Sequence, residues 1–416
     1  MKRRVVITGC GAISPVGCTV DTLWKNLVNG KCGIDFIKKF DTTDLKVTVA
    51  GEVNDFEPLD YIKKNEIRKT DLFTQYALGA AIQAMEDSGV QDHVDPTRLG
   101  VYMGSGIGGI HTFITECEKM ATKGPGRISP FFIPMMISNI AAGNIAIRYN
   151  AQGPCLPVVT ACATSTNAIG EAYRAIKHGY ADAIIAGGTE ASITPLSIAG
   201  FTNCMALTTV SDPTQASIPF DKRRSGFVMG EGAGAVILED LETALQRGAK
   251  IYGEIVGYGN TCDAYHITAP HPEAIGGARA ITLALDEAVA TGLNLNDQQF
   301  YVNAHGTSTP LNDKSETIAI KKALGDHISR TLVSSTKSMT GHMLGAAGAI
   351  EAIASVMALK DGVIPPTIGY VEPDPDCDLD VVPNQKRLVQ SDVALSVSLG
   401  FGGHNACLAF TKYAGV

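Results

Sequence analysis

One pattern occurs twice in this sequence and constrains the fold more than any other feature. The segment Val158–Glu190 begins with a β-like apolar run, bends, continues as a long amphipathic helix and ends in a second β-like run. The segment Leu332–Ile364 repeats that order with a helix rich in glycine and alanine. An internal repeat of this length indicates two similar structural units. We therefore expect two α/β halves, residues 1–250 and 251–416, packed so that one site can draw on both.

Strand-like and helix-like segments alternate along the rest of the chain, which favours sheets covered by helices. The apolar spacing of Thr74–Ser88 predicts a helix. Glycine contributes 44 of 416 residues and charged residues only 18%, as expected for closely packed layers. Short apolar runs predict strands at Val5–Thr8, Leu99–Met103, Val158–Thr160, Ala183–Ala186, Gly234–Leu238 and Phe300–Val302.

Composition and charge exclude several classes of protein. Hydrophobic residues make up 45% of the chain, which excludes a disordered protein. The net charge of −8 argues against nucleic-acid binding. No window offers the roughly 20 apolar residues of a membrane span, so we expect no membrane association. The ten cysteines form no C-x-x-C pair, which predicts reduced, mostly buried thiols in the cytoplasm, or in an organelle stroma or matrix if the source is eukaryotic.

Cys162 is the first candidate functional residue. It lies in a run of small residues, Thr160–Ser165, between an apparent strand and a helix with apolar positions 168, 169, 172, 173 and 176. Free amide groups and the positive end of the helix dipole favour a thiolate at such a position. The same amides could hold the oxyanion of a thioester under attack. Most cysteines only fill a core, but this context favours a nucleophile.

Two further motifs combine a polar side chain with small residues. His305 follows an apparent strand and stands in the run Asn303–Pro310, which is rich in glycine and hydroxyl residues. A histidine in an apolar core would not need such neighbours. The run Leu399–Asn405 contains three glycines, which allow the backbone to turn sharply and approach a substrate.

The start of the repeated helix carries a third motif. In the run Ser335–His342, Lys337 and His342 stand five residues apart. Glu351 follows on the helix among apolar neighbours, so it is expected to be partly buried and to need a partner. Lys337 is a candidate for that partner.

A dinucleotide site is a competing interpretation. The run Gly104–Gly109 fits G-x-G-x-x-G after an apolar segment. About 20 residues later, however, the sequence is Lys123–Gly126, without the acidic residue that binds a ribose. We therefore do not expect nicotinamide binding.

Taken together and in this order, residues 160–165, 303–310, 335–342 and 400–405 resemble the β-ketoacyl-acyl-carrier-protein synthases, and within them the elongating enzymes of type II fatty acid synthesis. The resemblance covers nearly the whole chain. It implies a thiolase-like fold with two βαβαβαββ halves, a five-layered αβαβα core and a homodimer. It also implies decarboxylative condensation of malonyl-acyl-carrier-protein with an acyl chain held as a thioester on Cys162.

The resemblance assigns roles residue by residue. Cys162, in the first half, resembles the nucleophile. His305 and His342, in the second half, resemble the pair that promotes decarboxylation, with Lys337 as their electrostatic partner. The remaining implied roles are the oxyanion hole (amides of Cys162 and Phe401), the gate (Phe401), supporting residues (Glu351, Asp313), pantetheine binding (Thr307, Thr309), the acyl tunnel (Ile107, Phe132, Phe201) and carrier docking (Lys63, Lys64, Arg68, Lys69, Arg127).

The resemblance also bears on cofactors. No cofactor or metal is expected, because two neutral imidazoles can stabilise an enolate and phosphopantetheine arrives on the acyl carrier protein. A monovalent cation is possible in the family, but the sequence identifies no ligand set for it. Two departures stand out: Asn312 replaces a frequent glycine, and Met205 replaces a basic residue, which weakens that part of the docking patch.

Several related enzymes remain as alternatives. A type III priming synthase uses Cys–His–Asn, whereas the third member here resembles His342. A thiolase needs a second catalytic cysteine, for which Cys407 is the only late candidate. A polyketide ketosynthase stays open because the same residues serve both reactions. A non-catalytic chain-length partner subunit would lack the nucleophile that is present here.

Overall fold

The computed structural model describes residues 3–413 and 415. Ten strands form its main sheet, in the order β10-β9-β13-β14-β8-β1-β7-β6-β4-β5. The first half contributes β1 (Val5–Ile13), β4 (Leu99–Gly104), β5 (Cys155–Leu156), β6 (Ala183–Glu190) and β7 (Gly232–Asp240). The second half contributes β8 (Gly253–Cys262), β9 (Phe300–Asn303), β10 (Thr331–Ser334), β13 (Val393–Gly400) and β14 (His404–Thr411).

Both halves have the same strand order. We number the five strands of each half from one to five along the chain. From the edge of the sheet to its centre, their spatial order is then 3-2-4-5-1 in both halves. The second strand is parallel to the third and the fourth, and the other pairs are antiparallel. The halves meet where β1 pairs with β8 over three residues of each strand. The repeat seen in the sequence is thus a repeat of topology.

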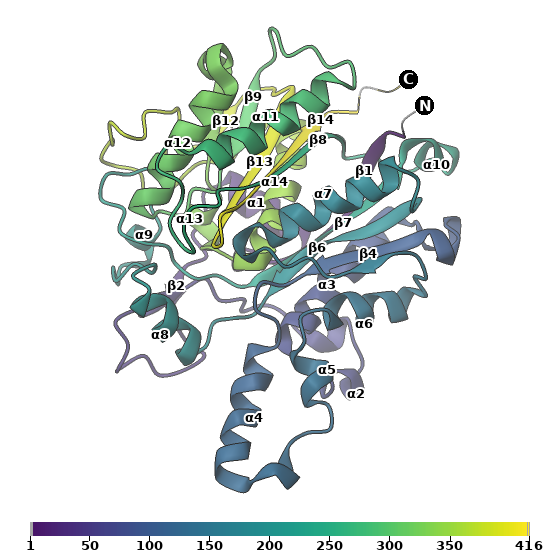
Figure 1. Ribbon diagram of the computed structural model, residues 1–416, viewed down its shortest axis with the longest axis vertical. Helices are drawn as coiled ribbons and strands as arrows, with labels where there is room; N and C mark the ends of the chain where they lie inside the picture. The colour runs from purple at the N-terminus through teal and green to yellow at the C-terminus, as the bar shows by residue number, and fades with distance from the viewer. Residues whose placement is uncertain (1–2, 414, 416) are drawn as a thin grey trace.

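Helices cover both outer faces and fill the space between the halves (Figure 1). On the outer face of the first half lie α3 (Leu72–Ser88) and α6 (Ile140–Tyr149). On the outer face of the second half lie α11 (Ile275–Val289) and α12 (Pro310–Leu324). The central layer consists of α7 (Thr164–Lys177) and α14 (Ala347–Asp361). The layers therefore follow the order αβαβα.

Further elements surround this core. None of the helices in the described part of the chain has the length and hydropathy that a bilayer crossing requires. The helices outside the five layers are α1 (Val20–Val28), α2 (Lys64–Ile67), α4 (Ile110–Lys123), α5 (Phe132–Met136), α8 (Pro195–Asn203), α9 (Pro213–Ala216), α10 (Leu241–Gln246) and α13 (Lys337–Thr340). Two small sheets are formed by β2 (Asp35–Phe36) with β3 (Val49–Ala50) and by β11 (Val363–Ile364) with β12 (Arg387–Leu388).

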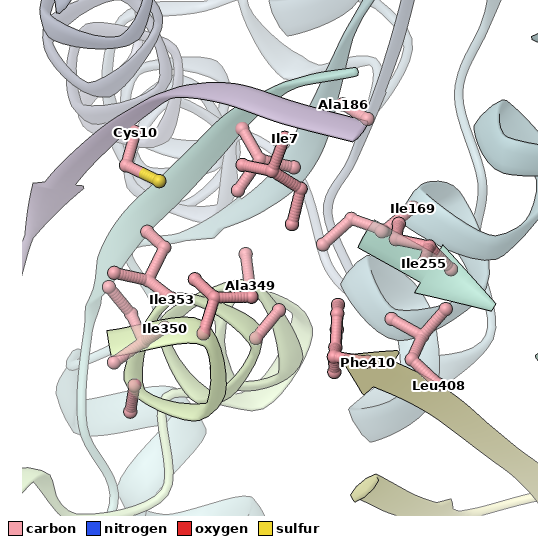
Figure 2. Packing of buried hydrophobic residues seen from close by; sticks show 14 of the residues in the cluster. Ile7, Cys10, Ile169, Ala186, Ile255, Ala349, Ile350, Ile353, Leu408 and Phe410 are labelled. Atoms are coloured by element: carbon pink, nitrogen blue, oxygen red, sulfur yellow. The ribbon is translucent and has the colours of Figure 1, made fainter. Parts of the chain in front are cut away.

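Side chains alternate between the central and outer cores along the buried strands. In β6, Ala186 faces the central layer and Ile185 faces α3 and α6. In β14, Phe410 faces the central layer and Cys407 faces α11 and α12. Figure 2 shows the central core, where side chains of β1, β8 and β14 meet those of α7 and α14. Strands buried on both faces are apolar at successive positions, which is why they appear in the sequence as unbroken apolar runs.

The two central helices touch at their first turns. A Cβ atom on Gly348 of α14 would lie 1.9 Å from Thr166 Oγ1 of α7, so only glycine permits this approach. Both helices begin at this contact. The segments that precede them, which carry Cys162 and His342, are therefore brought to one place.

Most predicted elements are confirmed, but one strand is wrong. The helix expected from Thr74 begins two residues earlier, and five of the six predicted strands are present. Residues Val158–Thr160 are not a strand; the strand β5 ends before them. The Thr160 amide instead donates to Thr164 Oγ1 at 2.9 Å, because the chain leaves the sheet to form the turn before α7.

The cysteines also differ from expectation. All ten are free thiols, and Cys10, Cys377 and Cys407 are buried as predicted. Four others are exposed, because they lie on surface helices, at a sheet edge or at strand and helix ends: Cys117, Cys155, Cys204 and Cys262. The prediction that most of the thiols fill cores is therefore wrong.

Candidate active site

A cavity of about 370 Å³ is lined by residues of both halves. Cys162 and Phe201 come from the first half, and His305, His342 and Phe401 from the second. Cys162 immediately precedes α7, and His342 lies just before α14. The cavity therefore contains the segments that the central helices bring together.

A tight turn presents Cys162 to the cavity. The turn is a short 3₁₀ helix, Ala161–Ala163, in which Ala161 has a left-handed φ of 50°. Gly400 packs against it: a Cβ there would lie 2.9 Å from the Thr160 carbonyl oxygen. This approach places the Phe401 amide, together with the amide of Cys162 itself, near the thiol, where the two amides favour its anionic form. The two amides predicted to form an oxyanion hole thus converge at the sulfur.

The two histidines face each other beside the thiol. Their ring centroids are 5.2 Å apart and the ring planes are nearly perpendicular, at 89°. Cys162 Sγ and one ring nitrogen of each histidine lie within 4.8 Å of one another. Both rings are 2% exposed, and His305 Nδ1 and both His342 nitrogens have no hydrogen-bond partner within the described residues. These nitrogens are therefore free to bind a substrate.

Burial keeps both histidines neutral. Desolvation lowers the pKa of His305 and His342 well below the usual value, and the nearby Lys337 charge lowers both further. Neutral imidazole has one N–H donor and one acceptor nitrogen. Each ring can thus donate a hydrogen bond to a carbonyl oxygen that gains negative charge.

Burial raises the pKa of the Cys162 thiol, whereas the sequence led us to expect a lowered pKa. Desolvation raises the pKa of the thiol to about 11, although Lys337 and the Phe401 amide lower it. The direction of this shift is opposite to the one expected from the sequence: the helix terminus and amides are present, but the loss of water outweighs them.

Lys337 and Glu351 form the buried ion pair considered from the sequence. Their side chains are each 2% exposed, and Lys337 Nζ donates to Glu351 Oε1. Burial raises the pKa of Glu351, and the Lys337 charge opposes that shift. Breaking such a pair leaves one buried charge uncompensated, which typically costs 3–5 kcal/mol.

A second buried carboxylate, Glu316, positions the His305 loop. It accepts hydrogen bonds from the amides of His305 at 2.6 Å and Gly306 at 2.7 Å. Burial raises the pKa of Glu316 to about 8. Sequence reasoning missed this residue because nothing in the spacing of a glutamate on α12 reveals that it faces the loop before that helix.

The predicted supporting and pantetheine residues lie around the same loop. Asp313 is buried and accepts hydrogen bonds from the Phe220 amide at 2.9 Å and from Asn312 Nδ2 at 3.1 Å. The unusual Asn312 thus stabilises its neighbour. Thr307 and Thr309 both line the cavity, and their hydroxyl oxygens are 3.0 Å apart.

The predicted tunnel residues do not all reach this cavity. Phe201 lines it, and its ring lies 6.4 Å from that of Phe401. Ile107 and Phe132 are not among the lining residues. Ile107 lies within the G-x-G-x-x-G run, whose amides at Gly106 and Ile107 donate to the carboxylate of Glu190 rather than remaining free for a phosphate.

The predicted docking residues are exposed and lie away from the cavity lining. They flank or belong to α2 and the turn after α4, and Lys69 Nζ lies 5.3 Å from the centre of the Phe131 ring. None forms an ion pair with another described residue: Lys63, Lys64, Arg68, Lys69 and Arg127. Met205, in contrast, lines the cavity mouth and is 89% exposed.

Oxygen atoms beside the ion pair could hold a cation. Asn303 Oδ1, Glu351 Oε2 and Ser396 Oγ are buried without hydrogen-bond partners in the described part of the chain. Asn303 and Ser396 are paired across β9 and β13. Hard cations prefer oxygen ligands. The sequence singled out Glu351 as a partner of Lys337 but neither Asn303 nor Ser396, and the unpaired oxygens of all three are of the kind that a monovalent cation binds.

Comparisons with known proteins agree with this geometry. The family model of the beta-ketoacyl synthase N-terminal domain matches residues 2–244, and that of the C-terminal domain matches residues 252–371. The chain belongs to the β-ketoacyl synthase family. A 3-oxoacyl-[acyl-carrier-protein] synthase 2 from Synechocystis sp. is 53% identical over 414 residues, and one from Staphylococcus aureus is 52% identical over 413; each match covers 99% of both chains.

Solved structures confirm the thiolase-like fold predicted for this β-ketoacyl synthase. An ishigamide ketosynthase/chain length factor superposes with a TM-score of 0.92 at 37% identity, covering 100% of both chains. A type II polyketide acyl-carrier protein in complex with its ketosynthase gives 0.90 at 35% identity, covering 99% of this chain and 100% of that one.

The raised thiol pKa of the synthase predicts the pH dependence of Cys162 alkylation. Because the thiolate is the reactive form, the rate of Cys162 carbamidomethylation by iodoacetamide should rise about tenfold per pH unit from pH 7. The rate should continue to rise above pH 9. Quantitative mass spectrometry of the Cys162 peptide would follow this, with free cysteine as the reference and a Cys162→Ser variant to identify the signal. A plateau below pH 8 would show that the thiol is already ionised.

Proposed function

We propose that this synthase is a 3-oxoacyl-[acyl-carrier-protein] synthase that lengthens acyl chains by two carbons in type II fatty acid synthesis. One observation carries the proposal: a thiol, two neutral imidazoles and two backbone amides converge at one cavity. This set supplies a nucleophile, donors for an enolate and an oxyanion hole. No other group is required, since the phosphopantetheine arrives on the carrier.

In the first step, Cys162 takes the acyl chain. The sulfur attacks the acyl thioester, and the tetrahedral oxyanion accepts hydrogen bonds from the amides of Cys162 and Phe401. Because the thiol is protonated at rest, its proton must leave during attack, and an adjacent imidazole nitrogen can accept it. Collapse of the intermediate releases the carrier thiol and leaves an acyl thioester on Cys162.

In the second step, malonyl-carrier replaces the free carrier. Its thioester carbonyl accepts hydrogen bonds from His305 and His342, so that loss of CO₂ leaves an enolate rather than an unstabilised carbanion. The enolate carbon attacks the acyl thioester and forms the new C–C bond. The Cys162 thiolate departs and regains a proton, which yields 3-oxoacyl-carrier, CO₂ and free enzyme.

The observations favour this function over its alternatives. Relatives at 52–53% identity carry the name 3-oxoacyl-[acyl-carrier-protein] synthase 2, whereas the ketosynthase of the type II polyketide complex is 35% identical. Cys162 is present, unlike in a non-catalytic partner subunit. The third member of the cluster is His342 and not the asparagine of a type III enzyme. The free thiols support a reducing compartment, the cytoplasm or an organelle stroma or matrix.

Mass analysis of the carrier tests the reaction directly. Purified synthase, acyl-carrier and malonyl-carrier, without nicotinamide, should give a carrier whose chain is longer by two carbons and bears a keto oxygen. Cys162→Ala should abolish this product because no acyl-enzyme forms. CO₂ release without chain growth for any fatty acyl donor would favour the polyketide alternative. The absence of both CO₂ release and chain growth with every donor would contradict a catalytic role.

We propose that an acyl carrier protein docks on the basic residues around α2. Lys63, Lys64, Arg68 and Lys69 are exposed, and none is neutralised by an ion pair to a described residue. Positive side chains attract an acidic partner and raise its association rate. The carrier complex among the related structures supports a partner of this kind.

Charge reversal at Arg68 and Lys69 tests the docking surface. The double variant R68E/K69E should raise the KM for carrier-linked substrates about tenfold and leave the KM for a pantetheine-linked mimic unchanged, because only the carrier contacts the patch. Steady-state kinetics at two salt concentrations would measure both values. An equal change for the two substrates would contradict the docking role.

We also propose that the synthase is a homodimer formed through β5. This strand is at the edge of the main sheet, and its residues Cys155 and Leu156 are exposed. Unpaired edge strands readily pair with another strand. Large apolar side chains near it are exposed as well, including Phe131, Ile133, Ile147 and Val159.

Sedimentation analysis would test the dimer. At micromolar concentration the mass should be twice the 43.7 kDa of one chain. Leu156→Glu should shift the protein toward the monomer, because it places a charge in the centre of the proposed contact. A wild-type mass of one chain would contradict the proposal.

A further inference from the structure

A third buried carboxylate, Glu190, lies at the end of β6 beside the catalytic turns. It is fully buried, and it forms no ion pair with another described residue. Its charge influences the Cys162 thiol, which places it near the nucleophile. Neither the repeat nor the motifs of the sequence singled it out. A buried carboxylate without a cation must be satisfied by hydrogen-bond donors, so its partners reveal what it holds.

Five donors surround the Glu190 carboxylate. Oε2 accepts hydrogen bonds from the amides of Gly106 at 2.9 Å and Gly345 at 3.1 Å. Oε1 accepts the Ser105 hydroxyl at 2.9 Å, the Ser192 hydroxyl at 3.2 Å and the Ile107 amide at 3.3 Å. Gly106 and Gly345 come from different halves of the chain. A single oxygen atom thus links the two halves.

Two glycines make this link possible. A Cβ on Gly345 would lie 2.6 Å from the Gly106 amide nitrogen and 2.8 Å from Glu190 Oε2. A Cβ on Gly106 would lie 2.8 Å from the same oxygen and 3.6 Å from the Ala161 carbonyl oxygen. The loop at Gly106 therefore lies between the carboxylate and the turn that carries Cys162.

The second linked segment is the turn after His342. Residues Leu344–Ala346 form a 3₁₀ turn that contacts the turn Ala161–Ala163. Leu344 has a left-handed φ of 49°, a conformation that persists in a residue other than glycine only when its surroundings hold it. The bond from the adjacent Gly345 amide to Glu190 is one such restraint. The ring of His342 accepts and donates no hydrogen bond within the described residues, so its position depends on the backbone that carries it. That backbone is held on one side by hydrogen bonds to Val228 and Gly230 and continues on the other into this turn.

We propose that Glu190 is a positioning residue for decarboxylation: its carboxylate fixes the turn that follows His342 against the turn that carries Cys162. The inference rests on the proposed function, since it concerns the step in which His342 acts. Acylation of Cys162 depends on the thiol, the two amides at the sulfur and one imidazole that accepts the thiol proton, a role that the unpaired Nδ1 of His305 can fill. Glu190 forms a hydrogen bond to none of these groups. Loss of the carboxylate should therefore affect the second half-reaction far more than the first.

Glu190→Gln tests this division. The side chain keeps its size, but one oxygen becomes an NH₂ group that must face a backbone N–H donor. Two rates are measured separately: acylation of Cys162 from acyl-carrier in a single turnover, by protein mass, and CO₂ release from malonyl-carrier. We expect decarboxylation to fall at least tenfold with little change in the KM for malonyl-carrier, and acylation to change less than threefold.

Glu239→Gln provides the matched control. Glu239 is also a fully buried carboxylate of the same sheet, but it pairs with Arg247 and is adjacent to Ala183 at the opposite end of β6. Its loss should lower thermal stability and leave the ratio of the two rates unchanged. If Glu190→Gln does not fold, Gly345→Ala disturbs the same contact and should give the same selective loss.

The outcomes separate this inference from the proposed function. If the wild-type protein performs both half-reactions and Glu190→Gln slows them by the same factor, or slows neither, the positioning role is wrong and the function stands. If the wild-type protein performs neither, the proposed function fails and the inference fails with it. A selective loss of decarboxylation that Glu239→Gln does not reproduce would establish the role.

Discussion

The contact between the first turns of α7 and α14 determines much of this structure. The two helices are the central layer of five, and each half of the main sheet packs against them from one side. Their closest approach, at Gly348 and Thr166, places the segments before both helices next to each other. Those segments carry the nucleophile and one of the histidines. Because the rest of each half is arranged around these helices, the position of the site follows from the packing of the core.

Loss of water at this position controls the chemistry more than any single charge. It keeps His305 and His342 neutral, which suits them to donate hydrogen bonds to an enolate. It also keeps Cys162 protonated at rest, even with a helix terminus, a lysine and two amides close by. Buried carboxyl groups at this position have partners, as Glu351 has in Lys337 and Glu190 has in its five donors. The reactive groups are thus uncharged until a substrate changes their surroundings.

The sequence predicted helices and candidate site residues correctly where these depend on a local pattern of residues. Periodic apolar residues located both central helices, and motif spacing identified Cys162, His305, His342 and Lys337, which the structure brings to one region. It failed where the outcome depends on tertiary contacts. Val158–Thr160 is apolar and β-branched, but the chain turns there to reach α7. Glu190 and Glu316 could not be recognised, since their donors are brought to them only by folding. The thiol pKa depends on the balance of burial against nearby charge, which spacing does not encode.

The repeated strand order has a consequence for how such a site can arise. Helices α7 and α14 occupy equivalent places, each after the third strand of its half, so they meet near a pseudo-twofold axis. Two identical units related by a twofold axis would necessarily place the same residue at the site twice. Once both units belong to a single polypeptide, each is free to diverge. Here one copy has a thiol before its helix and the other an imidazole. Covalent linkage of two topologically equal halves therefore permits the asymmetry that a two-step reaction requires.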